Sequence, residues 1–169
     1  GQAIGLAAAQ STNEALIQSA YLILEEDSGL GIGKLIKQGV RVKLATNSMA
    51  ANNHLSAFLS YRKQRKRMLA NGAEVYEMRP DAKTERVHFT AEELDAHKTS
   101  FGLHAKTMVF DRKIVFVGSF NLDPRSVNLN TEMGLMVESE SLGKAVAQSI
   151  EDDIAAGSSW QLILKEDGK

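Results

Sequence analysis

Residues 104–121 read HAKTMVFDRKIVFVGSFN, in which two apolar runs flank the charged triplet DRK at 111–113. The triplet is typical of a tight turn, so the two runs are predicted to pair as an antiparallel β-hairpin. Successive side chains of a strand point to opposite faces, which places His104 and Lys106 side by side on one face. A hairpin built only for burial would not carry both of these side chains at its open end.

The returning strand ends in Gly118, Ser119 and Asn121, and it brings them back to the end of the hairpin that holds His104 and Lys106. Gly118 permits a tight backbone there. The group then contains an imidazole, an ammonium, a hydroxyl and an amide, a set that suits phosphate ester chemistry. The imidazole can attack phosphorus as a nucleophile, and the other three groups can hold the non-bridging oxygens as negative charge builds.

Lys106 supplies the positive charge that a metal ion would otherwise supply, so neither a metal ion nor another cofactor is expected. An attacking His104 must be neutral and of fixed tautomer, which requires a carboxylate beside its second ring nitrogen. Glu132, in the sequence NTEMG of the next predicted strand, is the best candidate for that carboxylate. Asp111 is expected to hold the turn, because aspartate favours turns.

The rest of the chain alternates predicted helices and strands. Strands are predicted in AYLILEE (20–26), VRVKLATN (40–47), AEVYEMR (73–79), TEMGLMVES (131–139) and WQLIL (160–164). STNEALIQSA (11–20) predicts a helix end, with Ser11 or Thr12 as N-cap and Glu14 in the first turn. Further helices are predicted in GIGKLIKQG (31–39), from Ser56 to Leu69, and in SLGKAVAQSIEDDIAA (141–156). Residues 81–100 are polar and predict a loop with one helical turn at TAEELD. This alternation predicts a single α/β domain with a mixed β-sheet flanked by helices.

Composition excludes several classes of protein. The chain has 169 residues, 43% hydrophobic and 24% charged, which is ordinary for a soluble globular domain. Its net charge of −1 creates no global field that steers nucleic acid toward it, so nucleic acid binding is not expected. It has no cysteine, which excludes disulfides and thiolate metal sites. No apolar run is long enough to span a membrane, and no signal peptide is visible.

Two further stretches are candidates for binding. YRKQRKR at 61–67 is the strongest basic run, and it is either a solvated helix face or a contact for anionic headgroups or a nucleic acid backbone. Asn47 and Ser48 follow a predicted strand and could line the site, because strand-end loops in α/β sheets often do so. The chain opens with Gly1 rather than Met, so we expect a processed product or a piece of a longer protein.

The spacing His-x-Lys-x4-Asp-x6-Gly-Ser-x-Asn over 104–121 resembles the HKD signature of the phospholipase D superfamily. NLDPRSVNLNTEMGLMVES at 121–139 is similar to its continuation in bacterial cardiolipin synthase-like members. RVKLATNSMAANN at 41–53, the Tyr/Arg-rich helix and NGAEVYEMRP at 71–80 resemble the segment before their second HKD motif. The resemblance spans residues 15–145. SAYLILEEDSG at 19–29 departs from it, because the family more often has a proline-containing stretch there.

This resemblance implies one lobe of the phospholipase D fold and an enzyme that acts through a phosphohistidine. It assigns the nucleophile or general acid to His104, phosphate binding to Lys106, Ser119 and Asn121, orientation of the histidine to Glu132, and the motif aspartate to Asp111. The Tyr and Arg of the family's basic helix fall near Tyr61 and Arg65. The implied reaction is phosphatidyl transfer or phosphodiester hydrolysis on phospholipids, with peripheral membrane contact and a location at the bacterial inner membrane or in the cytoplasm.

The number of motifs sets the main alternatives. Family members use two HKD motifs at one shared site, but this chain has one, since no motif surrounds His54, His88 or His97. The chain is therefore expected to be either the C-terminal half of a two-lobed enzyme or one subunit of a homodimeric HKD-type nuclease or general phosphodiesterase. The extended resemblance to cardiolipin synthases favours the first. A binding module that retains the fold without turnover is the third hypothesis, although a decayed site would be expected to lose His104 or Lys106 first.

Overall fold

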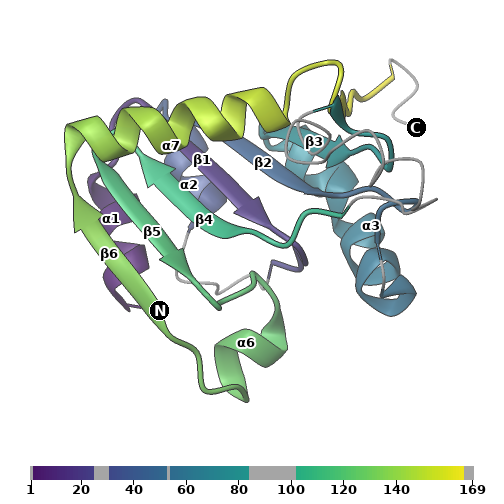
Figure 1. Cartoon of the computed structure of the whole chain (residues 1–169), viewed down its shortest axis with the longest axis horizontal. Helices are drawn as coiled ribbons and strands as arrows, with labels where there is room; N and C mark the ends of the chain where they lie inside the picture. The colour runs from purple at the N-terminus through teal and green to yellow at the C-terminus, as the bar shows by residue number, and fades with distance from the viewer. Residues whose placement is uncertain (1, 25–30, 53, 84–101, 166–169) are drawn as a thin grey trace, which may run out of the picture.

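The computed structural model describes residues 2–24, 31–52, 54–83 and 102–165. Within them, seven strands form one mixed sheet in the order β6-β5-β4-β1-β2-β3-β7, as Figure 1 shows. The strands are β1 (Glu14–Ser19), β2 (Arg41–Asn47), β3 (Glu74–Met78), β4 (Lys106–Phe110), β5 (Ile114–Gly118), β6 (Gly134–Glu138) and β7 (Ser159–Gln161). The helices are α1 (Gln2–Gln10), α2 (Ile32–Lys37), α3 (Leu55–Ala70), α6 (Pro124–Asn128) and α7 (Glu140–Asp153). The predicted fold class, a mixed sheet flanked by helices, is confirmed.

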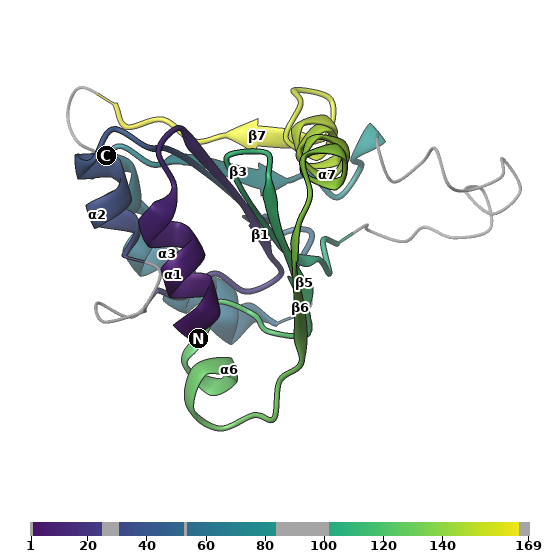
Figure 2. The ribbon, with the colours of Figure 1, turned by 90° about the vertical axis from the view of Figure 1, so that its left-hand side faces the viewer.

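Helices cover both faces of the sheet (Figure 2). α1, α2 and α3 pack on one face, where their apolar residues join strand residues such as Ile17, Met108 and Phe110 in the main core. α7 packs on the other face, where Ala147 and Ile150 contact strand residues. The alternating pattern of β4 explains both cores, because Met108 and Phe110 face α1–α3 while Val109 faces α7.

The pairing of strands gathers one set of strand ends at a single edge of the sheet. β1 and β2 are parallel, so their carboxyl ends, Ser19 and Asn47, lie at the same edge. β4 is antiparallel to β1 and pairs Ser19 with Lys106, which brings the amino end of β4 there as well. β5 returns antiparallel to β4 and ends at Gly118 beside them. The open end of the hairpin therefore lies where the two parallel strands finish.

The first strand is where the sequence prediction was wrong. β1 at Glu14–Ser19 replaces the predicted helix end at 11–20. Residues 20–24 of the strand predicted at 20–26 form no regular strand, and residues 25–26 lie outside the described residues. All six residues of β1 are buried, because it lies at the centre of the sheet between β4 and β2. A strand buried on both faces loses the polar–apolar alternation that identifies a strand in sequence. Its polar members have partners: Glu14 pairs with Arg41 and Arg112.

The other predicted elements are confirmed with small shifts of their ends, including the hairpin, the helix from Ser56, and α7. β6 begins at Gly134, later than the predicted strand at 131–139, and β7 is limited to Ser159–Gln161. The helical turn predicted at 90–95 lies outside the described residues.

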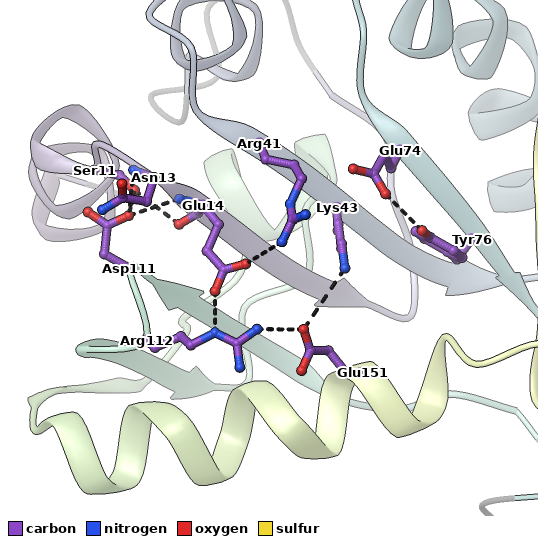
Figure 3. A network of polar contacts seen from close by, with 10 residues as sticks. All are labelled: Ser11, Asn13, Glu14, Arg41, Lys43, Glu74, Tyr76, Asp111, Arg112 and Glu151. Carbon is purple, nitrogen blue, oxygen red and sulfur yellow. Dashed lines mark hydrogen bonds and ion pairs between the residues drawn. The ribbon is translucent and has the colours of Figure 1, made fainter.

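The hairpin turn ties β4 to the start of β1. Asp111 and Arg112 both have positive φ angles, 51° and 53°, the left-handed conformation that tight hairpin turns require. The Asp111 carboxylate accepts hydrogen bonds from the backbone N–H groups of Thr12, Asn13 and Glu14 at 2.8–2.9 Å and from the Ser11 hydroxyl at 3.0 Å. Figure 3 shows Asp111 with Ser11, Asn13 and Glu14, beside the Glu14–Arg112–Glu151 ion pairs. Asp111 therefore fixes residues 11–14, the segment that leads into the central strand β1.

We expect Asp111→Asn to lower the free energy of unfolding by about 2 kcal/mol at pH 7, because it removes a carboxylate that accepts several backbone hydrogen bonds. Burial alone would raise the pKa of Asp111, but the hydrogen bonds from Glu14, Thr12 and Asn13 outweigh burial and hold this pKa below its usual value. A lowered folded-state pKa contributes stability that is present above the unfolded-state pKa, about 3.9, and is lost as the pH falls through the folded-state pKa. The difference between wild type and variant should therefore shrink in acid.

Urea unfolding of both proteins between pH 7 and pH 3 measures this difference. Asp152→Asn is the matched control, because Asp152 is an exposed carboxylate on α7 whose hydrogen bond comes from Gln148 in the same helix. It should change stability by less than about 0.5 kcal/mol. Equal stabilities of Asp111→Asn and wild type at pH 7 would show that the clamp does not stabilise the fold.

Candidate functional site

Lys106 is a buried cation at the site edge of the sheet. Its side chain leaves the first residue of β4, the residue as a whole is 9% exposed, and its ammonium donates a hydrogen bond to the His104 carbonyl at 2.8 Å. Burial lowers the pKa of Lys106, and the negative charges of Glu132 and Asp123 partly oppose this. His104 lies two residues before it in the sequence and is exposed. A buried ammonium beside an exposed imidazole presents charge to a ligand with little competition from water.

Asn47 holds the backbone that leads into His104. It is 3% exposed at the end of β2, and its side-chain amide donates to the Leu103 carbonyl at 2.8 Å and to the Ala20 carbonyl at 3.3 Å. Its amide oxygen accepts from the Leu103 N–H at 2.6 Å. The sequence predicted that Asn47 could line the site, because Asn47 ends a predicted strand. It did not predict that the Asn47 side chain fixes the backbone of Leu103 through two hydrogen bonds.

Ser119 and Glu132 form a second pair at this edge. The Ser119 hydroxyl donates to the Glu132 carboxylate and accepts from the Met133 N–H at 3.0 Å. Gly118 is required just before them, because a Cβ there would lie 2.5 Å from the Met133 carbonyl oxygen. The hydrogen bond from Ser119 is the largest cause of a lowered pKa at Glu132, and the charge of Lys106 contributes in the same direction. Both effects favour the ionised form of Glu132, whose negative charge interacts with the positive charge of Lys106.

The predicted partnership between Glu132 and the histidine has no hydrogen bond in the described part of the chain. Glu132 instead accepts from Ser119 and from the Asn130 amide, the latter at 3.2 Å. It lies two residues before β6 begins, in a connection rather than on the strand itself. Orientation of His104 by Glu132 therefore stays a prediction.

Asn121 contributes an amide whose oxygen is buried. Its Oδ1 atom is buried and has no hydrogen-bond partner among the residues that the structure describes. The segment around it is fixed, because the Leu122 N–H donates to the Ser19 hydroxyl at 3.0 Å and Leu122 bridges to Leu22. Asn121 also lines a cavity of about 490 Å³. A buried amide oxygen without a hydrogen-bond donor costs free energy, so this atom is an exception to the usual pairing of buried polar groups.

Asp111 is the predicted site residue that the structure does not bring to this group. It follows the last residue of β4, whereas Lys106 is the first residue of that strand. Five residues of extended strand separate them by about 17 Å. The turn that contains Asp111 therefore lies at the opposite edge of the sheet.

The basic run of α3 divides into two parts. Tyr61 and Arg65 face inward, where the tyrosine hydroxyl and the guanidinium both donate to the Glu77 carboxylate, at 3.0 and 2.9 Å. Burial is the main cause that raises the pKa of Tyr61 above its ordinary range. Arg62 and Lys66 are exposed and form no ion pair within the described ranges. Only the outward part of the run is therefore available to a binding partner.

The arrangement is suited to holding a phosphodiester. Strand pairing brings the Lys106 ammonium, the Ser119 hydroxyl and the Asn121 amide to the end of the sheet where the hairpin opens, and His104 is exposed at the same end. Groups of these kinds can bind phosphate oxygens. The described residues contain no cluster of three or more His, Asp or Glu side chains placed to hold a metal ion.

Comparison of the sequence with known proteins identifies similar chains. The family model described as "Cardiolipin synthase, PLD-like domain" matches residues 6–154. Cardiolipin synthase C of Escherichia coli K12 is 36% identical over 154 residues, which cover 90% of this chain and 32% of the relative. An uncharacterized protein of Helicobacter pylori J99 is 33% identical over 152 residues, covering 88% of this chain and 28% of its own length. The chain thus spans about a third of the length of these relatives.

Solved structures share the fold. Nuc from Salmonella typhimurium, a phospholipase D family member, superposes with a TM-score of 0.66 at 14% identity, over 96% of this chain and 90% of that chain. Phosphatidylserine synthase of Haemophilus influenzae superposes with a TM-score of 0.67 at 18% identity, over 95% of this chain and 36% of that chain.

Proposed function

The chain belongs to the phospholipase D-like family of cardiolipin synthase domains, whose members are phosphodiesterases and phosphatidyltransferases, and we propose that it supplies one half of a phospholipid-transferring active site. The observation that carries the proposal is the buried Lys106 ammonium at the open end of the hairpin, beside the exposed His104 and the Ser119–Glu132 pair. This set provides a nucleophile together with donors for phosphate oxygens. Asn121 adds a third polar group to it.

The reaction proceeds in two displacements. The neutral His104 imidazole attacks phosphorus, a P–N bond forms, the P–O bond to the leaving alcohol breaks, and a general acid protonates that alcohol. An acceptor alcohol or water then attacks phosphorus, a P–O bond forms, the P–N bond breaks, and the acceptor's proton passes to the same group, now acting as a base. Lys106 stabilises the charge on the non-bridging oxygens in both steps. If His104 instead serves as the acid, the second histidine is the nucleophile.

The second histidine comes from a further lobe of the same protein. The chain spans about a third of its relatives' length, which leaves room for such a lobe in a parent protein of similar size. Large apolar side chains are exposed on the connection and strands beside Ser119, at Met133 (82%), Leu135 (66%) and Val117 (50%). Burying exposed apolar side chains against another protein surface lowers the free energy, so patches of this kind often mark interfaces. A docked lobe would cover it and bring its own motif to the edge of the sheet.

The test of the proposed function is an assay of the parent protein on vesicles that contain phosphatidylglycerol. The expected result is cardiolipin plus glycerol when transfer dominates, or phosphatidic acid plus glycerol when water is the acceptor. Either product pair supports phosphodiester chemistry on lipid and says which acceptor is used. If the lipid stays unchanged while DNA is cleaved, the lipid assignment is wrong.

A homodimeric nuclease or general phosphodiesterase is the second candidate. Nuc shares the fold over 90% of its own chain, so one chain of about this size can make a complete subunit. Light scattering of this chain over a range of concentrations separates the two cases. A stable dimer that hydrolyses DNA or a simple phosphodiester would favour the second candidate, and an inactive monomer would favour a half-site.

We also propose that α3 contacts an anionic membrane surface. Arg62 and Lys66 line a groove together with the C-terminal residues Ile163 and Leu164, of which Ile163 is 78% exposed. Lys63 is exposed on the same helix. Cations beside exposed aliphatic side chains suit a lipid headgroup layer better than a nucleic acid backbone. None of the described helices has the length and apolar character needed to cross a membrane.

The measurement is co-sedimentation with vesicles of anionic lipid. The triple variant Arg62→Gln, Lys63→Gln, Lys66→Gln should bind roughly 100-fold more weakly, because each basic residue near an anionic surface contributes about 1 kcal/mol. Lys144→Gln is the control, since Lys144 is an exposed lysine on α7, away from α3. Equal binding by the triple variant and wild type would remove α3 from the membrane contact.

A further inference from the structure

Asp123 is a buried carboxylate to which the proposed reaction gives no role. It is 8% exposed and caps the first turn of α6, where it accepts hydrogen bonds from the Arg125 and Ser126 N–H groups at 2.9 and 3.1 Å and from the Ser126 hydroxyl at 3.1 Å. It forms no ion pair with another residue of the described ranges. A serine or an asparagine would cap this helix as well, so capping does not explain why a charge is buried here.

Strand pairing and two hydrogen bonds place Asp123 near Lys106. The register of β1 and β4 pairs Ser19 with Lys106. The fully buried Ser19 hydroxyl accepts a hydrogen bond from the Leu122 N–H at 3.0 Å. Asp123 follows Leu122 directly, and its own N–H donates to the Asn121 carbonyl at 2.9 Å. The segment that carries Asp123 is therefore held against the residue that pairs with the lysine.

The charge of Asp123 acts on the lysine. Burial lowers the pKa of Lys106, whereas the negative charges of Glu132 and Asp123 raise it. Glu132 is partly exposed, so water weakens the effect of its charge, but Asp123 is buried and its charge is screened less. Further titratable side chains around this edge are exposed or partly exposed: His104 before β4, Tyr21 after β1, His54 at the start of α3 and Arg125 on α6.

Resting on the proposed function, we propose that Asp123 is a positioning residue for the reaction, and that its buried carboxylate keeps the Lys106 side chain charged between one phosphate and the next. A site without a phosphate offers the ammonium no phosphate oxygen, and its buried surroundings then favour the neutral amine. A neutral amine would bind the next phosphodiester more weakly and would not stabilise the charge that develops on its oxygens. The three hydrogen bonds of the α6 cap fix the carboxylate that prevents this loss of charge.

The test is a pH titration of the lysine side chains of this chain, followed by NMR with ¹³C-labelled lysine. The Lys106 signal is identified by its absence in Lys106→Met. Asp123→Asn and Asp123→Ser keep a capping side chain but remove the charge, so we expect Lys106 to titrate at lower pH in both than in wild type. In the parent protein, the same two variants should lower the ratio of activity at pH 9 to activity at pH 7 by about threefold or more.

Asp152→Asn is the matched control, because Asp152 is an exposed carboxylate on α7, which packs on the other face of the sheet. It should leave the Lys106 titration where it is in wild type. Both Asp123 variants keep an acceptor for the first turn of α6, so both should fold, and dispersed amide spectra check this. A purely structural role of Asp123 would change stability without moving the titration of the lysine.

An unmoved Lys106 titration in the two Asp123 variants would overturn the proposal, and so would an equal movement in Asp152→Asn. Because the titration involves no turnover, its failure is distinct from failure of the proposed reaction. A lowered Lys106 titration in the variants, together with a parent protein that does not turn over lipid, would uphold the link between Asp123 and Lys106 and reject the reaction. Lipid turnover with an unmoved titration would uphold the reaction and reject the role of Asp123.

Discussion

His104→Ala in the parent protein is expected to reduce turnover of phosphatidylglycerol by about 10⁴-fold or more, the loss typical of removing a nucleophile or its proton-transfer partner. His104 is exposed at the end of the segment that Asn47 holds, so its removal leaves no buried gap and stability should change little. The loss would therefore reflect chemistry rather than unfolding. His88→Ala is the matched control, because no motif surrounds His88 in the sequence.

The same variant separates the two roles open to His104. A p-nitrophenyl phosphodiester has a leaving group that needs no proton, so a variant that lacks only the general acid should retain much of its activity on that substrate. A variant that lacks the nucleophile should lose activity on both substrates and form no covalent phosphoenzyme in rapid-quench experiments. Lipid turnover within tenfold of wild type would exclude both roles and with them the proposed mechanism.

The hairpin could be predicted from sequence because its chemistry and its fold follow the same alternation. Met108 and Phe110 are buried in the main core by the same two-residue period that places Lys106 at the site. The spacing from His104 to Asn121 spans a single hairpin, so local geometry was enough to bring these residues to one edge. The turn role expected for Asp111 likewise depends on local backbone preference, although the residues it clamps, 11–14, lie far away in sequence.

The features that could not be predicted depend on distant packing. β1 carries no alternation because both of its faces are covered, and its register against Lys106 is visible only once the sheet forms. Asn47 and Leu103 are separated by 56 residues, so their paired hydrogen bonds leave no sequence pattern. The same holds for the cavity at Asn121, which α3 and α6 enclose from different parts of the chain.

Lys106→Met is expected to lower kcat by about 10² to 10³-fold, since it removes a preorganised charge from the oxygens on which negative charge develops. Methionine keeps most of the buried side-chain volume, so the fold should be retained. Lys106→Arg should not restore activity, because the site is built around a compact ammonium that donates to the His104 carbonyl. Lys113→Met is the matched control, because Lys113 belongs to the same hairpin but is exposed and pairs with Glu138 at 2.8 Å.

The pH dependence and the effect of chelators test the same lysine from two further directions. Lys106 acts as a cation, so activity should fall as the pH rises through its pKa, and burial places that pKa below the ordinary value of about 10.4. The alkaline limb of kcat should therefore begin below that value in wild type and disappear in Lys106→Met.

A charge supplied by the chain also predicts full wild-type activity in EDTA. Loss of wild-type activity in EDTA and its recovery with Mg²⁺ would transfer the electrostatic role from Lys106 to a metal ion, and the buried ammonium would then have to be explained as part of the fold alone.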